Sequence, residues 1–402
     1  MKKILAILLF AVMVVGFAAC TPANTDEPET IDVKIGFICL HDEQSTYDLN
    51  FINAAKEAQE NLGLTDDQVI IKTNIPEGDE CYVAAKDLVD QGCDIIFANS
   101  FGHEDFIIKA AKEFPEVEFC HATGTKAHTE NLANYHNAFA SIYEGRYLAG
   151  VAAGLKLNEL KAAGKLKGDT AKMGYVGAYT YAEVISGYTS FYLGAKSVCP
   201  EVTMDVQFTG SWFDPVEEKN AAQALIAAGA DLISQHADSM GAPSTCEEAG
   251  IPNVSYNGST VASCPNTFIV SSRINWAPYY EYIIKCVSED KAIAADWCGG
   301  IEEGSVVLTD INDKAAAAGT KEKIEAVMAD IKAGTVKIFD TAKFTVNNGE
   351  TKTNYLADVD TDDAFTPDTE VIANGIFEES VKRSAPYFDL RIDGIKLLNE
   401  KY

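Results

Sequence analysis

Residues 93–122 read CDIIFANSFGHEDFIIKAAKEFPEVEFCHA and hold one complete β-α-β pattern. The apolar runs 93–98 and 117–122 each predict a buried strand. Between them, apolar residues recur at helical spacing and predict a helix over 104–114; they are Phe106, Ile107, Ala110, Ala111 and Phe114. Strands joined through a helix run parallel, so this stretch predicts a parallel sheet covered by helices on both faces.

The same alternation continues on both sides of this stretch. Upstream, strands are expected at 31–40 and 69–73, with helical patterns at 51–62 and around 84–89. After Tyr135 a second series alternates helices and strands, at 141–157, 173–178, 183–198, 203–208, 216–228 and 231–235. We therefore expect an α/β fold with two Rossmann-like, doubly wound lobes in tandem. A ligand would bind between them, at the carboxyl ends of the strands.

Length and charge narrow the possibilities further. A single core stops growing near roughly 250–300 residues, so a chain of 402 residues is expected to form two lobes. The chain has 32 basic and 60 acidic residues and a net charge of −28. Such a field repels nucleic acids and anionic lipid surfaces, so no nucleic-acid partner is expected.

The first twenty residues are typical of a targeting segment. Lys2 and Lys3 precede an uncharged apolar run at 4–19, which is short for a bilayer span of about 20 residues. Residues 17–20 read FAAC and resemble a bacterial lipobox, in which Cys20 carries the lipid. We expect a signal peptide at 1–19, a tether at 20–30 and lipid anchoring on the extracytoplasmic face of the cell membrane. The alternatives are an ordinary secretory signal and an uncleaved membrane anchor.

Motifs of metal sites and of enzymes are absent from the sequence. The nine cysteines after Cys20 form no C-x-x-C pair, so no metal, redox or cofactor site is expected. The sequence also contains no H-E-x-x-H, G-x-S-x-G or P-loop motif. An enzyme, for example a nucleoside hydrolase, is therefore not expected.

Four loops after predicted strands carry aromatic and polar side chains. They read HDEQSTYD at 41–48, NSFG at 99–102, GSWFDP at 210–215 and QHADS at 235–239. Aromatic rings can sandwich a flat, neutral heterocycle, while amides and carboxylates hydrogen-bond its edge. Alternatively, Tyr47 and Trp212 pack beneath the loops as core residues. Among the six histidines, His236 is the one we expect to contact a ligand.

Several of these motifs resemble the basic membrane protein family of solute-binding lipoproteins. They are EGRYLAG at 144–150, GSWFDP at 210–215 and QHADS at 235–239, and NWAPYY at 275–280 matches one branch of the family. The resemblance spans about residues 34–348 and implies a type I periplasmic-binding-protein fold with three hinge strands. The N-lobe would comprise 31–135 and 273–298, and the C-lobe 136–272 and 299–402. The resemblance further implies a monomer that delivers purines to the permease subunits of an ABC importer.

The resemblance also assigns roles to single residues. Tyr47 and Trp212 take the places of the two rings that clamp the base in family members, and Asp48 replaces an Asn. Independently of the resemblance, Asn99, Gln235, His236 and Asp238 lie on the converging loops and are expected to hydrogen-bond the edge of the base.

The family's two sugar ligands are not matched in this sequence. Asn257 stands where an Asp that binds ribose is expected, and Ile274 stands near the ribose Lys, with Arg273 beside it. We therefore expect a free nucleobase such as adenine. A purine nucleoside is one alternative, and a receptor that passes its ligand to a sensor is another.

Overall fold

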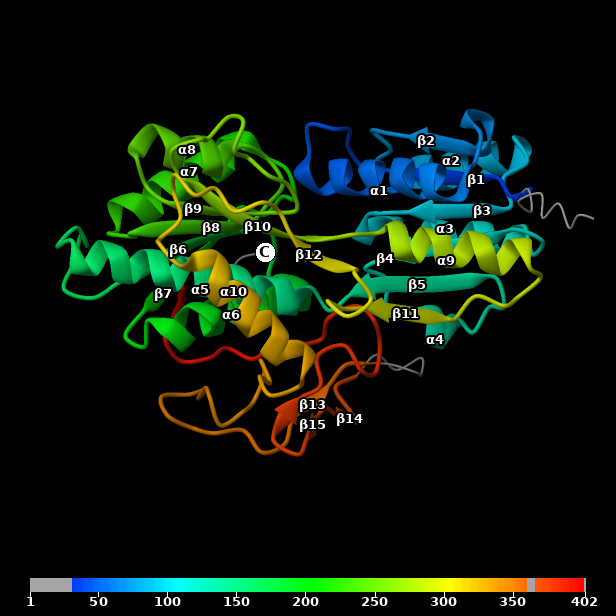
Figure 1. Cartoon of the computed structure of the whole chain (residues 1–402). Coiled ribbons are helices and arrows are strands. Elements are labelled where there is room, and N and C mark those ends of the chain that lie inside the picture. The colour runs from blue at the N-terminus through cyan, green and yellow to red at the C-terminus, as the bar shows by residue number, and fades with distance from the viewer. Residues whose placement is uncertain (1–30, 360–365, 401–402) are drawn as a thin grey trace, which may run out of the picture.

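The computed structural model describes residues 31–359 and 366–400. The predicted signal peptide, the lipid-bearing Cys20 and the tether up to residue 30 lie outside the described residues. Two large sheets, each covered by helices, form the two lobes of the molecule, and Figure 1 shows them side by side. The predicted α/β fold with two doubly wound lobes is therefore confirmed.

The first sheet belongs to the N-lobe and consists of parallel strands. Its order is β11-β5-β4-β3-β1-β2, and its members are β1 (Ile35–Ile38), β2 (Val69–Lys72), β3 (Ile95–Ala98), β4 (Glu118–Ala122), β5 (Tyr135–Ala140) and β11 (Asp296–Gly299). Both faces are covered, by α1 (Thr46–Leu62) and α9 (Ala277–Ser288) on one side and by α2 (Asp79–Asp90) and α3 (Glu104–Glu113) on the other. The short helix α4 (Ala127–Glu130) precedes β5.

The second sheet belongs to the C-lobe and is parallel except at one edge. Its order is β12-β10-β9-β8-β6-β7-β17, with β12 antiparallel to β10. The strands are β6 (Lys172–Gly177), β7 (Thr203–Phe208), β8 (Leu232–His236), β9 (Asn253–Tyr256), β10 (Phe268–Ile274), β12 (Val306–Leu308) and β17 (Ile395–Leu397). Its helices are α5 (Ile142–Ala162), α6 (Ala182–Val198), α7 (Pro215–Ala227), α8 (Gly241–Ala249) and α10 (Thr320–Lys332).

The chain passes between the two sheets at three places, each one to five residues beyond the expected boundary. Strand β5 of the first sheet ends at Ala140, where the boundary was expected at 135. Strand β10 of the second sheet ends at Ile274, where it was expected at 272, and β11 of the first sheet ends at Gly299, where it was expected at 298. The sequence analysis did not predict β5, because His136 and Asn137 interrupt its apolar pattern. Both side chains are nevertheless buried and hydrogen-bonded. We call these three crossings the hinge.

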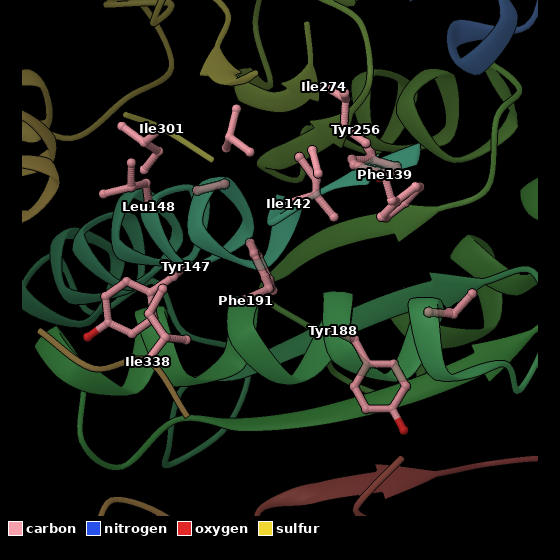
Figure 2. Packing of buried hydrophobic residues seen from close by; sticks show 14 of the residues in the cluster. Phe139, Ile142, Tyr147, Leu148, Tyr188, Phe191, Tyr256, Ile274, Ile301 and Ile338 are labelled. Atoms are coloured by element: carbon pink, nitrogen blue, oxygen red, sulfur yellow. The ribbon is translucent and has the colours of Figure 1, made fainter. Parts of the chain in front are cut away.

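Helices α5 and α6 pack unusually closely below the hinge. A Cβ at Gly150 would lie 2.0 Å from the carbonyl oxygen of Phe191, and a Cβ at Gly194 would lie 2.0 Å from that of Tyr147. Figure 2 shows Tyr147 and Phe191 among the buried residues of this contact. The EGRYLAG motif at 144–150 is thus a packing motif, in which glycine lets two backbones touch.

The chain after α10 packs against both lobes. It contains two small hairpins, β13 (Leu356–Ala357) with β14 (Thr369–Glu370) and β15 (Ile372–Ala373) with β16 (Ile376–Phe377). The Ser384 N–H donates to Asp296 Oδ2 of the N-lobe at 2.9 Å, whereas β17 pairs with β7 of the C-lobe. Figure 1 shows this segment in orange and red beneath both sheets.

Candidate functional site

A pocket lies between the two lobes, at the carboxyl ends of the strands. Its free space is about 390 Å³, part of which opens to solvent. The N-lobe contributes Leu40, His41, Tyr47, Asp48, Ser100, Phe101 and Thr123, and the C-lobe contributes Glu183, Trp212, His236 and Asp238. Five of the eight ligand residues expected from the sequence line it, namely Tyr47, Asp48, Trp212, His236 and Asp238.

The lobes contact each other around this pocket. The Thr46 N–H donates to the Asp238 carbonyl oxygen at 3.0 Å, and the Thr46 hydroxyl donates to the same oxygen at 3.2 Å. Across the cleft, the ring centroids of Phe101 and Tyr181 lie 5.1 Å apart. The structure is therefore closed over the pocket.

Tyr47 forms a firmly held aromatic wall on the N-lobe side. It is the second residue of α1, and its hydroxyl donates to the Asn99 carbonyl oxygen at 2.6 Å. Its ring packs edge-on against Phe51, with centroids 4.7 Å apart. Burial raises the pKa of the Tyr47 hydroxyl well above its ordinary value, so this group stays a neutral donor.

Trp212 provides the aromatic wall of the C-lobe. It follows the turn at Gly210, where φ is +79°, and its ring packs edge-on against Tyr179 at 5.0 Å. Tyr179 in turn stacks on Tyr181 at 5.0 Å. Trp212 is half-buried, so its ring packs against neighbouring rings and also lines the pocket.

The tyrosines of the loop after β6 were not among the residues predicted from the sequence. The detectable signal was a second aromatic pair, Tyr179 and Tyr181, directly after a predicted strand.

The Asp48 carboxylate accepts three hydrogen bonds from donors of its own lobe. Oδ1 accepts from Asn99 Nδ2 at 2.7 Å and from the His41 N–H at 3.1 Å, and Oδ2 accepts from Ser45 Oγ at 2.7 Å. Ser45 is the N-cap of α1, and its hydroxyl accepts from the Asp48 N–H, so the two residues cap the helix together. The Asp48 carboxylate therefore fixes the N-lobe wall.

Asp238 is in the opposite situation. Its side chain is buried, and its one hydrogen bond within the described residues comes from Asn257 Nδ2 at 3.5 Å. Burial raises the pKa of the Asp238 carboxyl well above its usual range, and the negative charges of Glu218, Asp48 and Glu183 raise it further. Asp238 is thus a buried acceptor that lacks a strong donor.

His236 pairs with a carboxylate that the sequence analysis did not select. His236 Nε2 lies 3.4 Å from Glu183 Oε1, and Glu183 is in the first turn of α6. Burial lowers the pKa of His236, while Glu183 opposes that shift. The sequence feature that could have indicated Glu183 is its position just after the loop at 179–181. There a helix begins at the end of the sheet where ligands bind.

Three expected ligand residues lie outside the pocket lining. Both polar atoms of the Asn99 side chain have partners: Nδ2 donates to Asp48, and Oδ1 accepts from the Leu40 N–H at 3.1 Å. Gln235 points into the C-lobe, where its Oε1 accepts from Asn253 Nδ2 at 2.9 Å. Asn257 lies behind Asp238 in a left-handed turn with φ +64°. Asn99 and Asn257 thus contact the pocket residues Asp48 and Asp238, whereas Gln235 is bonded within the C-lobe.

The basic residue closest in sequence to the family's ribose Lys also lies elsewhere. Arg273 lines a separate groove along α1, and its guanidinium donates to Asn50 Oδ1 at 3.4 Å. None of the residues that line the main pocket is a Lys or an Arg. The wall of the pocket is therefore aromatic and acidic.

Three further findings concern the described residues as a whole. The nine cysteines after Cys20 are free thiols, and eight of them are buried. No group of three or more His, Cys, Asp or Glu side chains in this part of the chain is arranged to hold a metal ion. No helix between residues 31 and 400, leaving out 360–365, is long and apolar enough to cross a membrane.

Comparisons with known proteins agree with this architecture. Residues 38–342 match the family model described as ABC transporter substrate-binding protein PnrA-like. A purine-binding protein of Brucella abortus (strain 2308) is 33% identical over 329 residues, which cover 81% of this chain and 87% of that protein. A putative ABC transporter glucose-binding protein of Haloferax volcanii is 32% identical over 249 residues, which cover 60% of this chain and 59% of that protein.

A solved structure supports the fold independently. An ABC transporter solute-binding protein from Conexibacter woesei DSM 14684 superposes with a TM-score of 0.62 at 18% identity. The superposition covers 76% of this chain and 97% of that structure. At this identity the match concerns the fold, which in both proteins is that of a two-lobe solute-binding protein.

Proposed function

The chain belongs to the PnrA-like family of ABC transporter substrate-binding proteins, and we propose that it binds a purine nucleobase such as adenine in the pocket between its lobes. This is a family of substrate-binding proteins of extracytoplasmic transport systems and not a family of enzymes. The observation that carries the proposal is the pairing of Tyr47 from one lobe with Trp212 from the other in the lining of a single closed pocket. The named activity of the Brucella relative supports the choice of purines.

The composition of the pocket favours a base over a nucleoside. A ribose brings hydroxyl groups, and a buried hydroxyl without a partner costs about 1–3 kcal/mol. Asn257 and Arg273, which stand near the family's sugar-binding positions, are outside the pocket lining. Nucleotides are disfavoured as well, because their phosphates would meet Asp48, Glu183 and Asp238 with no Lys or Arg in the lining to balance them.

Ligand binding would be coupled to closure of the lobes. The base contacts both rings only when the lobes approach, and the Thr46–Asp238 hydrogen bonds form in the same closed state. A ligand shifts the balance toward closure by its extra affinity for the closed form. The permease subunits of the importer would then recognise the closed form.

Calorimetric titration of the purified protein tests the choice of ligand. We expect adenine to bind at least about tenfold more tightly than adenosine, a difference of roughly 1.4 kcal/mol. Guanine, hypoxanthine and glucose complete the panel, and glucose is included because of the Haloferax relative. Equal or tighter binding of the nucleosides would overturn the nucleobase proposal, and binding of glucose alone would overturn the purine proposal.

We also propose lipid attachment at Cys20, on the sequence evidence alone. The Cys20→Ala variant should leave the membrane fraction and lose the mass of the acyl chains. The matched control is Cys298→Ala, a change of the half-buried free thiol on β11. Membrane retention and mass that are unchanged in Cys20→Ala would contradict the lipoprotein assignment.

A further inference from the structure

Glu183 lies in the pocket wall with an unfilled capacity to accept hydrogen bonds. Its side chain is only 12% exposed, and it lines the pocket together with Trp212 and Asp238. Within the described residues its one polar partner is His236, at 3.4 Å from a single carboxylate oxygen. A carboxylate has two oxygens and roughly four acceptor sites, so most of this capacity remains available to a ligand.

The three carboxylates of the pocket are therefore not equivalent. Asp48 accepts three hydrogen bonds from its own lobe, whereas Glu183 and Asp238 have one long contact each. Glu183 and Asp238 follow neighbouring strands of the C-lobe. Glu183 is in the first turn of α6, which follows β6, and Asp238 is in the loop after β8. Two buried acceptors that share a pocket repel each other until donors arrive between them.

The pKa shifts of neighbouring groups agree with the position of Glu183 beside Asp238 in the pocket lining. Glu183 contributes to the raised pKa of Asp238 and also to the raised pKa of Tyr47 on the other lobe. Its carboxylate thus acts on both walls of the cleft. A ligand that offers N–H groups to this side of the pocket would satisfy both acceptors at once.

We propose that Glu183 is a specificity-determining residue, which accepts a hydrogen bond from one N–H group of the bound purine while Asp238 accepts from another. The inference rests on the proposed function and names the ligand's required chemistry, two separate N–H donor groups. Adenine has an exocyclic amino group and a ring N–H. 9-Methyladenine lacks the ring N–H, and unsubstituted purine lacks the amino group.

The test compares these three ligands on the unmodified protein and on Glu183→Gln. Glutamine keeps the size of the side chain but presents an NH₂ group where one acceptor oxygen stood. We expect the unmodified protein to prefer adenine at least about tenfold over both analogues. In Glu183→Gln, adenine affinity should fall about tenfold or more, and the preference over one of the analogues should shrink to about threefold or less.

A matched control separates this role from a general effect on the fold. Glu217 is in the first turn of α7, outside the pocket lining, so Glu217→Gln makes the same chemical change at a comparable helix position. We expect it to leave both preferences unchanged. A purely structural role of Glu183 would lower all three affinities by the same factor, and unchanged preferences in Glu183→Gln would overturn the inference.

Failure of the inference can be told apart from failure of the proposed function. If the unmodified protein binds none of the three ligands, the proposed function is wrong and the inference falls with it. If it binds adenine and Glu183→Gln retains the full preference over both analogues, only the role of Glu183 is wrong.

Discussion

The two walls of the cleft carry the same residue type in opposite environments. On the N-lobe, Asp48 accepts hydrogen bonds from Ser45, Asn99 and the His41 backbone. On the C-lobe, the Asp238 carboxyl is also buried, and within the described residues it has one hydrogen bond, at 3.5 Å. The Asp48 carboxylate of the N-lobe wall is therefore held by its own lobe, whereas in the proposed complex the Asp238 carboxyl of the C-lobe wall would receive a donor from the ligand. Residues of the N-lobe wall should govern stability, and those of the C-lobe wall should govern affinity.

The largest effect on affinity is expected from the ring of the C-lobe wall. Stacking of a base on an aromatic ring contributes on the order of 1–3 kcal/mol, or roughly tenfold to a hundredfold in affinity. Trp212→Ala should weaken purine binding by that factor in a calorimetric titration. Since Trp212 is half-buried, the melting temperature of the ligand-free protein should change little. Strong destabilisation of the ligand-free variant would show that this wall, too, is structural.

A paired substitution tests the contrast between the two carboxylates directly. In Asp48→Asn, an NH₂ group replaces one oxygen and meets donors, so the free energy of unfolding should fall by about 1–3 kcal/mol. In Asp238→Asn, the buried like charge is removed, and the ligand-free protein should be as stable as the unmodified one or more so. Urea denaturation of both variants measures the difference. Equal losses of stability would remove the distinction between the walls.

The pH dependence of stability sharpens the same contrast. Burial raises the pKa of Glu218 to about 7, and the pKa of Asp238 is raised as well. Such groups bind more protons in the folded than in the unfolded state, so stability falls as pH rises from the unfolded-state pKa of about 4 through the folded one. The buried histidines His103, His121 and His236, whose pKa values burial lowers, contribute a rise of stability over the same pH range. The contribution of Asp238 is therefore measured by denaturation as a difference: between about pH 4 and pH 7 the stability of the ligand-free unmodified protein should fall relative to that of Asp238→Asn, and a constant difference would mean that Asp238 does not contribute.

The smallest effect is expected from the hydroxyl of Tyr47. Tyr47→Phe keeps the ring and removes the hydrogen bond to the Asn99 carbonyl oxygen, which is worth about 1 kcal/mol. Purine affinity should fall by roughly fivefold or less. A loss as large as that of Trp212→Ala would mean that the hydroxyl, and not the ring, is the main contact of this wall.

The fold could be predicted from the sequence because each β-α-β unit carries its own pattern. The apolar runs at 93–98 and 117–122 correspond to β3 and β4, and the helix between them is α3. β5 escaped prediction, since His136 and Asn137 are buried by specific hydrogen bonds that no periodicity reveals.

The site could be predicted in part, and the limit has a physical reason. The sequence indicates which residues follow a strand, but it does not indicate which way each side chain points. Asn99 and Gln235 stand at the correct strand ends and turn to partners within their own lobes. Glu183 was not predicted because it belongs to the start of a helix and not to one of the loops after a strand.

The segment after α10 adds a mechanical element to the molecule. It is attached to the C-lobe through the pairing of β17 with β7 and to the N-lobe through the Ser384–Asp296 hydrogen bond. Any rotation that parts the lobes must either carry Ser384 along or break that bond. The segment therefore restrains the opening of the lobes in addition to the hinge. The free energy of opening includes a contribution from each of them. Stiffness of this kind can be tuned by substitutions at Asp296, whose carboxylate accepts the bond from the Ser384 backbone, without altering a single residue that lines the pocket.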